Sequence, residues 1–377
     1  MSVCTLLTIL KQISRLILNN MLPGKSICPI IILRPNFFHH LHPPTIPAVQ
    51  ARWRYTLGAG GTAIFLVLVL IVTGALEMFY YIPTPAEAAL SVQIITYSVP
   101  FGALVRNLHY WAGQFLIVIS GVHLLRVVFT GAYAPPRRFN YLLGLALFFF
   151  IVLLDFTGYI LRWDQGIQWA LVVGTNLVKS IPVIGNSLYQ MLVGGDQPGA
   201  ATLIRFYTWH VFGLMLLAAI LTIWHAFRVR RDGGIAVPPP QLRRDQNRIS
   251  RFELLRRESA AMLLTGAGLL LLSAFCPAPI APAITEITAL SGETHAPWFF
   301  LWVQQMLKWG DPFLLGVLVP VLVLVLLAFI PYIFPQPAEH ELGGWFPKSN
   351  RLAQVVLALV TLFIIILILL ALGPVVE

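Results

Sequence analysis

The chain has 377 residues, of which 58% are hydrophobic and only 11% are charged, and its formal net charge is +10. Soluble domains carry about 25% charged residues, so this composition excludes a water-soluble fold and indicates an integral membrane protein. A positive net charge can indicate nucleic-acid binding. Here, however, most of the 25 Lys and Arg residues gather in alternate loops, which indicates membrane orientation and no nucleic-acid partner.

Seven apolar runs are long enough to cross a ~30 Å hydrocarbon core, which takes about 20 helical residues. They cover roughly residues 57–81, 104–130, 139–161, 204–228, 259–277, 312–334 and 352–373. Basic residues precede the first run and follow the second, fourth and sixth. The positive-inside rule therefore predicts a cytoplasmic N-terminus, a C-terminus outside and, for a bacterial chain, the cytoplasmic membrane.

The predicted fold class is an all-α integral membrane protein, with a four-helix bundle followed by a three-helix half. Residues 1–20 are apolar on one side only and predict an interfacial helix. The predicted division is an N-terminal approach at 1–55, a four-helix domain at 56–232, a charged Pro/Gly linker at 233–257 and a three-helix domain at 258–377.

Four histidines lie inside apolar runs, in two pairs of similar spacing. His109 and His123 are fourteen residues apart, and His210 and His225 are fifteen apart. In an α-helix the first step returns to within about 40° and climbs ~21 Å; the second returns to within about 60° and climbs ~22 Å. Two such helices placed face to face would form two stacked bis-histidine sites, which fits two haems near opposite membrane surfaces. The simpler alternative is that the four histidines are hydrogen-bonded core residues. A zinc site is disfavoured because each level offers only two histidines and no further Cys or carboxylate ligands to complete a tetrahedron.

Glycines repeat with the same spacing in two other runs. Gly60 and Gly74 are fourteen residues apart, and so are Gly144 and Gly158. Small residues commonly serve helix packing in membranes. Their match to the histidine spacing favours a second interpretation, in which these positions make room for flat macrocycles at the two histidine depths.

The motifs taken together closely resemble cytochrome b of the cytochrome bc complexes, over nearly everything from about residue 50 to 373. The nearest likeness is the chloroplast-type form, in which a four-helix and a three-helix subunit are separate chains. The resemblance rests on Gly60/Gly74, RNLHYW at 106–111, HLLRV at 123–127, TGAYAPPR at 130–137, TGYILRWDQ at 157–165, IPVIG at 181–185 and RFYTWH at 205–210.

The resemblance implies a role for each matching residue. His109 and His210 would bind the iron of an outer haem b, and His123 and His225 that of an inner haem b. Arg106 and Arg126, each three residues from a ligand, would pair with haem propionates. An inner quinone pocket would lie near His225. The quinol pocket at the outer face would include Tyr159, Pro182, Ile184, Trp298 and Phe299.

The sequence departs from the family pattern at several positions. The usual Pro-Glu-Trp-Tyr motif of the quinol site is Ala296-Pro297-Trp298-Phe299, so its carboxylate is missing. The remaining candidates for a proton acceptor are Asp155, inside the third run, with Glu293 and His295. Gly58 occupies the position of a haem-tethering cysteine, which predicts no covalent haem there. Arg162 stands where proline is usual, with no role that the sequence assigns.

The sequence thus predicts the catalytic di-haem subunit of a quinol:cytochrome c oxidoreductase that moves electrons and protons across the membrane. The resemblance implies quinone and lipid contacts, a Rieske iron–sulfur protein and a c-type cytochrome as partners, and a homodimer. Two alternatives remain: a two-haem quinol oxidase module that does not bifurcate electrons, and, from another class, a transporter with structural histidines.

Overall fold

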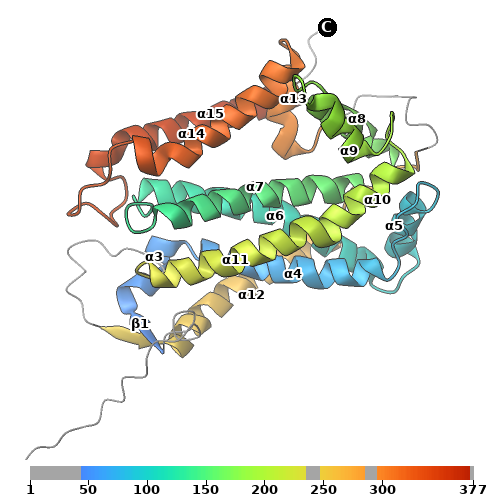
Figure 1. The fold of residues 1–377 in the computed structure, drawn as a ribbon. Helices are drawn as coiled ribbons and strands as arrows, with labels where there is room; N and C mark the ends of the chain where they lie inside the picture. The colour runs from blue at the N-terminus through green and yellow to red at the C-terminus, as the bar shows by residue number, and fades with distance from the viewer. Residues whose placement is uncertain (1–43, 235–246, 285–294, 374–377) are drawn as a thin grey trace, which may run out of the picture. The chain divides into compact units, whose positions relative to one another are not determined.

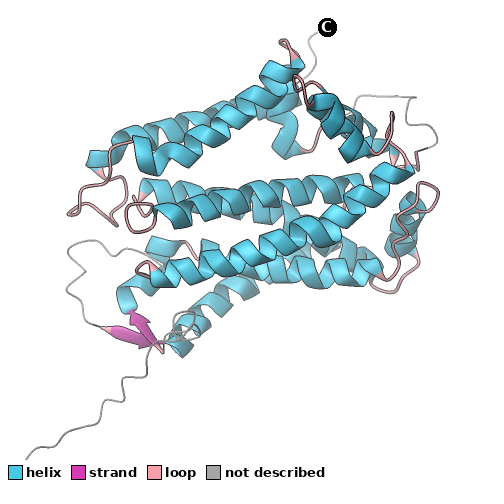
Figure 2. Ribbon diagram, in the orientation of Figure 1, coloured by secondary structure: helices cyan, strands magenta, loops and turns pink. Residues whose placement is uncertain are grey.

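The computed structural model describes residues 44–234, 247–284 and 295–373. These residues all belong to one unit, residues 39–377, and the interfacial helix predicted at 1–20 lies outside them. Seven helices of the described part are long and apolar enough to span a membrane, and each coincides with one of the predicted runs. Figure 2 shows that nearly all of the described chain is helical, because within lipid a single segment satisfies its own backbone hydrogen bonds only as a helix.

The first four spans pack in chain order. Helix α4 packs against α6, α6 against α7, and α7 against α11 (Figure 1). The fourth span is α10 and α11 joined by a π-helical turn, Trp209–Gly213. The bounds are α4 (Ala59–Met78), α6 (Gly102–Phe129), α7 (Arg138–Ile160), α10 (Ala200–Thr208) and α11 (Leu214–Arg231).

Short helices fill the loops at the outer ends of these spans. The loop between the third and fourth spans contains two helices on either side of Pro182, α8 (Gln168–Lys179) and α9 (Gly185–Val193). A further short helix, α5 (Ala88–Tyr97), follows α4 and packs against α6. The short helix α3 (Trp53–Thr56) precedes α4.

The fifth span, α12 (Arg251–Phe275), begins inside the segment predicted as a linker. Ser250 caps its N-terminus by accepting a hydrogen bond from the Glu253 backbone N–H at 3.3 Å. Just before it, β2 (Arg248–Ser250) pairs antiparallel with β1 (Thr45–Pro47). This two-stranded ribbon ties the start of the first half to the start of the second.

Each of the last three spans contacts the four-helix bundle. Helix α12 packs against α6 and α4, whereas α14 packs against α7 and α15 against α6 (Figure 1). Helix α13 (Leu301–Leu307) follows a 3-10 turn, Trp298–Phe300, and packs against α15. The remaining bounds are α14 (Val319–Ile333), preceded by a π-helical turn (Leu314–Leu318), and α15 (Arg351–Leu372).

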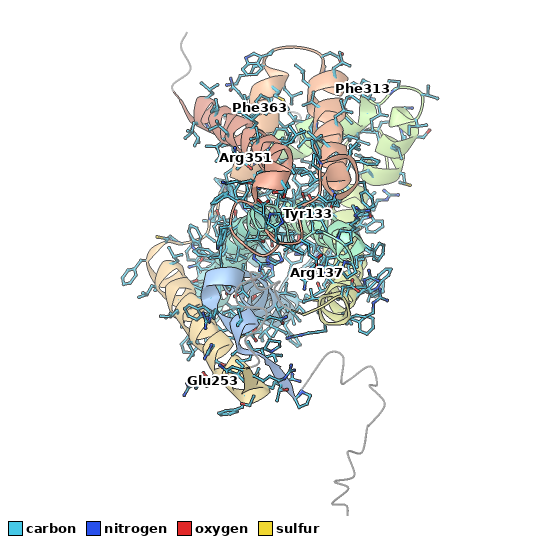
Figure 3. The ribbon with its side chains drawn as sticks, turned by 90° about the vertical axis from the view of Figure 1, so that its left-hand side faces the viewer. Tyr133, Arg137, Glu253, Phe313, Arg351 and Phe363 are labelled. Atoms are coloured by element: carbon cyan, nitrogen blue, oxygen red, sulfur yellow. The ribbon has the colours of Figure 1, made fainter. Side chains whose placement is uncertain are left out.

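Two tyrosines join the C-terminal helices to the bundle. Figure 3 shows Tyr133 where the C-terminal helices meet the bundle, and its side chain is fully buried. Asn350 donates a hydrogen bond to the Tyr133 hydroxyl at 3.2 Å, and the Tyr141 hydroxyl donates to the Leu327 carbonyl at 2.9 Å. Both bonds lie within an apolar cluster, so they fix the position of α14 and α15 on the bundle.

Candidate functional site

All four predicted histidines face one cavity of about 810 Å³ inside the first four spans. His109 and His123 come from α6, and His210 and His225 come from the fourth span. We call His109 and His210 the outer pair and His123 and His225 the inner pair, after the orientation that the basic loops predict. The size of the cavity falls within the usual range for sites that hold a cofactor or ligand.

The rings of the outer pair face each other across a gap that suits a metal ion. Their centroids are 6.2 Å apart and their planes are inclined at 66°. Metal–nitrogen bonds of ~2.0–2.1 Å, with about 1 Å more from each nitrogen to its ring centre, place two axial imidazoles about 6 Å apart. The separation of the His109 and His210 rings is therefore compatible with an iron atom between them.

Hydrogen bonds fix the orientation of the outer rings. The His210 Nδ1 atom lies 3.0 Å from the Leu154 carbonyl oxygen, which can only accept, so Nδ1 carries the hydrogen. The His109 Nδ1 atom lies 2.9 Å from the hydroxyl of Thr73, whose own hydrogen goes to the Val69 carbonyl, so this Nδ1 also donates. Both Nε2 atoms therefore keep a free lone pair, which is the tautomer that a metal ligand needs.

The inner pair has a different environment. The Nδ1 atoms of His123 and His225 are both buried, and within the described residues neither has a hydrogen-bond partner. The Asn140 backbone is close to His225, but its geometry does not complete a hydrogen bond to Nδ1. A buried ring nitrogen without a partner costs free energy, so the inner pair is held less firmly than the outer pair in the absence of a bound group.

Each of the four glycines lies against one of the four histidines. A Cβ atom at Gly60 would lie 3.9 Å from the His123 ring, and one at Gly74 would lie 3.0 Å from the His109 ring. At Gly144 the distance to the His225 ring would be 3.2 Å, and at Gly158 the distance to the His210 ring would be 2.6 Å. The glycines thus make room for the imidazole rings themselves, which the sequence had predicted only as room for a macrocycle.

The π-helical turn explains the unequal histidine spacing. His210 lies inside this turn, and a π turn holds about one residue more than an α turn. The turn absorbs the extra residue of the fifteen-residue step. His210 and His225 are therefore related much like residues fourteen apart in a continuous α-helix, as His109 and His123 are.

The two arginines predicted near the haems also line the cavity. Arg126 is buried at the inner end. Arg106 donates from Nη1 to the Ala278 carbonyl at 3.2 Å and from Nη2 to the Pro279 carbonyl. Arg106 therefore holds the segment after α12 against α6, and fewer of its donors are left for a bound anion.

The predicted quinol residues divide into two groups. Tyr159, Trp298 and Phe299 line the outer end of the cavity, together with Asp155. Pro182 and Ile184 are exposed in the turn between α8 and α9 and do not line it, so their predicted place in the pocket is not supported by the structure. The sequence analysis placed them there from the IPVIG motif alone, without the path of the loop.

Of the other two candidates for a proton acceptor, only His295 belongs to the described residues. His295 is exposed and lies outside the cavity lining. Glu293 lies outside the residues that the structure describes. Asp155 is therefore the only one of the three that the described cavity contains.

Asp155 is held by residues of two other segments. The Gln114 amide donates to its Oδ1 and Oδ2 atoms at 3.2 and 3.1 Å. The Trp298 indole N–H donates in turn to the Gln114 Oε1 atom at 2.6 Å. Gly113 provides the space, since a Cβ there would come within 2.6 Å of Oδ1.

The sequence did not point to two residues of the site, Glu77 and Gln114. Glu77, near the end of α4, lines the cavity, and its Oε1 atom is buried without a hydrogen-bond partner among the described residues. Gln114 is the second. A carboxylate inside an otherwise apolar span was the available signal for Glu77, whereas no sequence signal pointed to Gln114.

The structure also accounts for Arg162. Its guanidinium pairs with Asp164 at 2.7 Å and lies over the Tyr159 ring, 5.3 Å from the centroid. The same Asp164 carboxylate accepts a hydrogen bond from the Ala281 backbone N–H at 3.1 Å. Arg162 thus helps to hold the segment after α12 over the outer end of the cavity.

Taken together, these features fit haem between each pair of histidines. At the outer pair the Nε2 lone pairs are free, a glycine makes room for each imidazole, and the buried arginines can balance anionic groups. No group of three or more His, Cys, Asp or Glu residues within the described ranges could hold a metal ion by itself. The residues at each level therefore suit a metal whose remaining ligands come from a macrocycle.

Comparisons with known proteins agree with this geometry. Residues 114–286 match the family described as cytochrome b(N-terminal)/b6/petB. Cytochrome b6 of Heliomicrobium gestii is 39% identical over 174 residues, which is 46% of this chain and 82% of that protein; cytochrome b6 of Heliobacterium mobile is 40% identical over the same shares. Cytochrome b6 of Porphyra purpurea is 37% identical over 46% of this chain and 81% of its own length.

A solved structure extends the likeness beyond the matched segment. A chain described as "Hyperthermophilic respiratory Complex III" superposes with a TM-score of 0.69, covering 84% of this chain and 91% of that one. At 21% identity this similarity establishes the fold. The chain therefore belongs to the cytochrome b/b6 family and is a membrane cytochrome b subunit of the bc type.

Proposed function

We propose that this cytochrome b binds two haems b, one between His109 and His210 and one between His123 and His225. The observation that carries the proposal is the pairing of each histidine with its own glycine around one cavity. When bound, haem b accepts and releases single electrons. The ~21 Å rise between histidine levels on one helix would extend the electron path across the membrane core.

The outer end of the cavity would bind the quinol. Tyr159, Trp298 and Phe299 offer it an apolar and aromatic surface. Oxidation of a quinol to a quinone releases two electrons and two protons. Asp155 would accept one proton at a carboxylate oxygen, which is the role of the family's carboxylate at the position of Pro297. The second proton would pass to water at the outer surface.

Partner proteins would complete the reaction. The quinol would give one electron to a Rieske iron–sulfur protein, which would pass it to a c-type cytochrome. The second electron would cross the membrane through the haems to a quinone near His225. Arg126 would balance an anionic propionate at the inner level. The basic loops support a cytoplasmic N-terminus in a bacterial cytoplasmic membrane, and a homodimer and lipid contacts belong to the same proposal.

The histidine assignments are tested by the haem content of purified protein. We expect two haems b per chain, loss of one redox component in His109→Ala or His210→Ala, and loss of the other in His123→Ala or His225→Ala. A protein that contains no haem would favour the transporter alternative. Survival of both components in all four variants would overturn the ligand assignment.

The role of Asp155 is tested separately. We expect Asp155→Asn to slow quinol oxidation at least about tenfold, or ~1.4 kcal/mol in barrier, while both haems remain bound. Normal turnover in that variant would remove Asp155 from the proton path.

One observation favours a second candidate function. Pro297 replaces the family's carboxylate, which fits a two-haem quinol oxidase module that no longer bifurcates electrons. Rapid reduction by quinol distinguishes the two functions. Bifurcation reduces the high-potential partner and the inner haem in equal amounts, whereas the module sends both electrons through the haems.

A further inference from the structure

Gln114 lies between Asp155 and Trp298 at the outer end of the cavity. Its Oε1 atom accepts a hydrogen bond from the Trp298 indole, and its Nε2 atom donates to both oxygens of Asp155. The three side chains come from α6, α7 and the segment before α13, and all three line the cavity.

The chemistry of the partners allows only one orientation of the amide. An indole N–H can only donate, so it requires the amide oxygen. The amide nitrogen must then face Asp155, where it needs an acceptor. A reversed amide would place two donors together at Trp298 and two acceptors together at Asp155.

This orientation restricts where a proton on Asp155 can lie. The amide nitrogen has only hydrogens to offer, so a protonated carboxyl must present its other, unprotonated oxygen to Gln114. The Oδ1 atom of the carboxylate packs against Gly113 of α6, where a Cβ atom would come within 2.6 Å of it. A proton on Asp155 must therefore point away from the Gln114 amide, and the Asp155 side chain lines the cavity.

We propose that Gln114 is a positioning residue that holds the Asp155 carboxyl with its proton-bearing oxygen toward the quinol and couples this orientation to the seating of Trp298. The proposal rests on the proposed function, in which Asp155 accepts a quinol proton. Gln114 of α6 would determine which way the proton on Asp155 points. Movement of the Trp298 segment would be transmitted to Asp155 through the Gln114 side-chain amide.

Infrared difference spectra of the purified complex give a direct test. The C=O band of protonated Asp155 is identified as the band that Asp155→Asn removes. In Gln114→Met the carboxyl loses its donor, so we expect this band to move to higher frequency and quinol turnover to fall about tenfold in kcat, with KM within about twofold. Trp298→Phe keeps the ring and removes only the indole N–H, so it should move the band in the same direction by a smaller amount.

A surface pair supplies the matched control. The Gln190 amide donates to the Asp196 carboxylate at 2.9 Å at an exposed position, so Gln190→Met removes the same type of bond without changing the band or the rate. Haem content in every variant reports assembly, and Trp298→Phe tests the idea if Gln114→Met fails to assemble.

The outcomes separate the inference from the proposed function. An unchanged band in Gln114→Met or Trp298→Phe would overturn the inference, even if Asp155→Asn remains slow. Full turnover in Asp155→Asn, or no carboxyl band in the wild type, would overturn the role of Asp155 and the inference with it.

Discussion

Replacement of the four cavity glycines by alanine should damage the two proposed haem sites in an order that the structure sets. Carbon atoms in contact prefer about 3.5 Å or more. A Cβ at position 158 would come 2.6 Å from the His210 ring, so the ring must move about 0.9 Å. The corresponding movement is about 0.5 Å for Gly74 and about 0.3 Å for Gly144, and Gly60 requires none.

The cost at position 158 should be large because His210 cannot move freely. Its Nδ1 atom is held by the Leu154 carbonyl and by Thr157, at 3.0 and 3.1 Å. Overpacking of a tight interior costs about 1–3 kcal/mol. Since ~1.4 kcal/mol is a factor of ten, Gly158→Ala should weaken retention of the outer haem by about 5- to 150-fold.

Redox titration of isolated membranes measures both haems at once. Total haem is determined separately, and His109→Ala and His123→Ala identify the outer and inner components. We expect the outer component to be lost or shifted in Gly158→Ala and less affected in Gly74→Ala. The inner component should shift slightly in Gly144→Ala and stay normal in Gly60→Ala, which is the matched control. Equal damage in Gly60→Ala and Gly158→Ala, or a normal outer component in Gly158→Ala, would refute the proposed packing.

Three further predictions concern the same cavity. Thr157→Val removes an acceptor from His210 Nδ1, so the midpoint potential of the outer haem should rise without loss of the inner haem; an unchanged potential would argue against histidine ligation there. Glu77→Gln removes a buried acid near the outer pair and should raise the same potential, since a negative charge stabilises oxidised haem; a fall would contradict this. Finally, Gly58 offers no thiol, so haem staining after denaturing electrophoresis should show no band on this polypeptide, and a stained band would reveal a covalent link at another position.

Much of the architecture follows from the sequence because its rules are local. Each span must present about 20 apolar residues to lipid, and the seven runs read from the sequence are the seven spans of the structure. The step from His109 to His123 fixes their shared face and their separation along α6, whatever the neighbouring helices do. The equal glycine spacing indicated two matching levels for the same reason.

Tertiary structure alone determined which residues meet across helices. The pairing of Gly158 with His210 depends on the rotation of α7 against the fourth span, and the π turn at His210 changes that rotation by an amount that no periodicity predicts. The contact of Trp298 with Gln114 joins residues 184 positions apart.

The sequence did not predict the paths of the loops either. Pro182 belongs to a motif that the resemblance placed in the quinol pocket, yet the turn between α8 and α9 exposes it. The segment after α12, by contrast, is held over the cavity by its hydrogen bonds with Arg106 and Asp164. Spacing along one helix is a property of the backbone, whereas the choice of partner depends on the packing of all the helices at once, and so only the folded chain determines it.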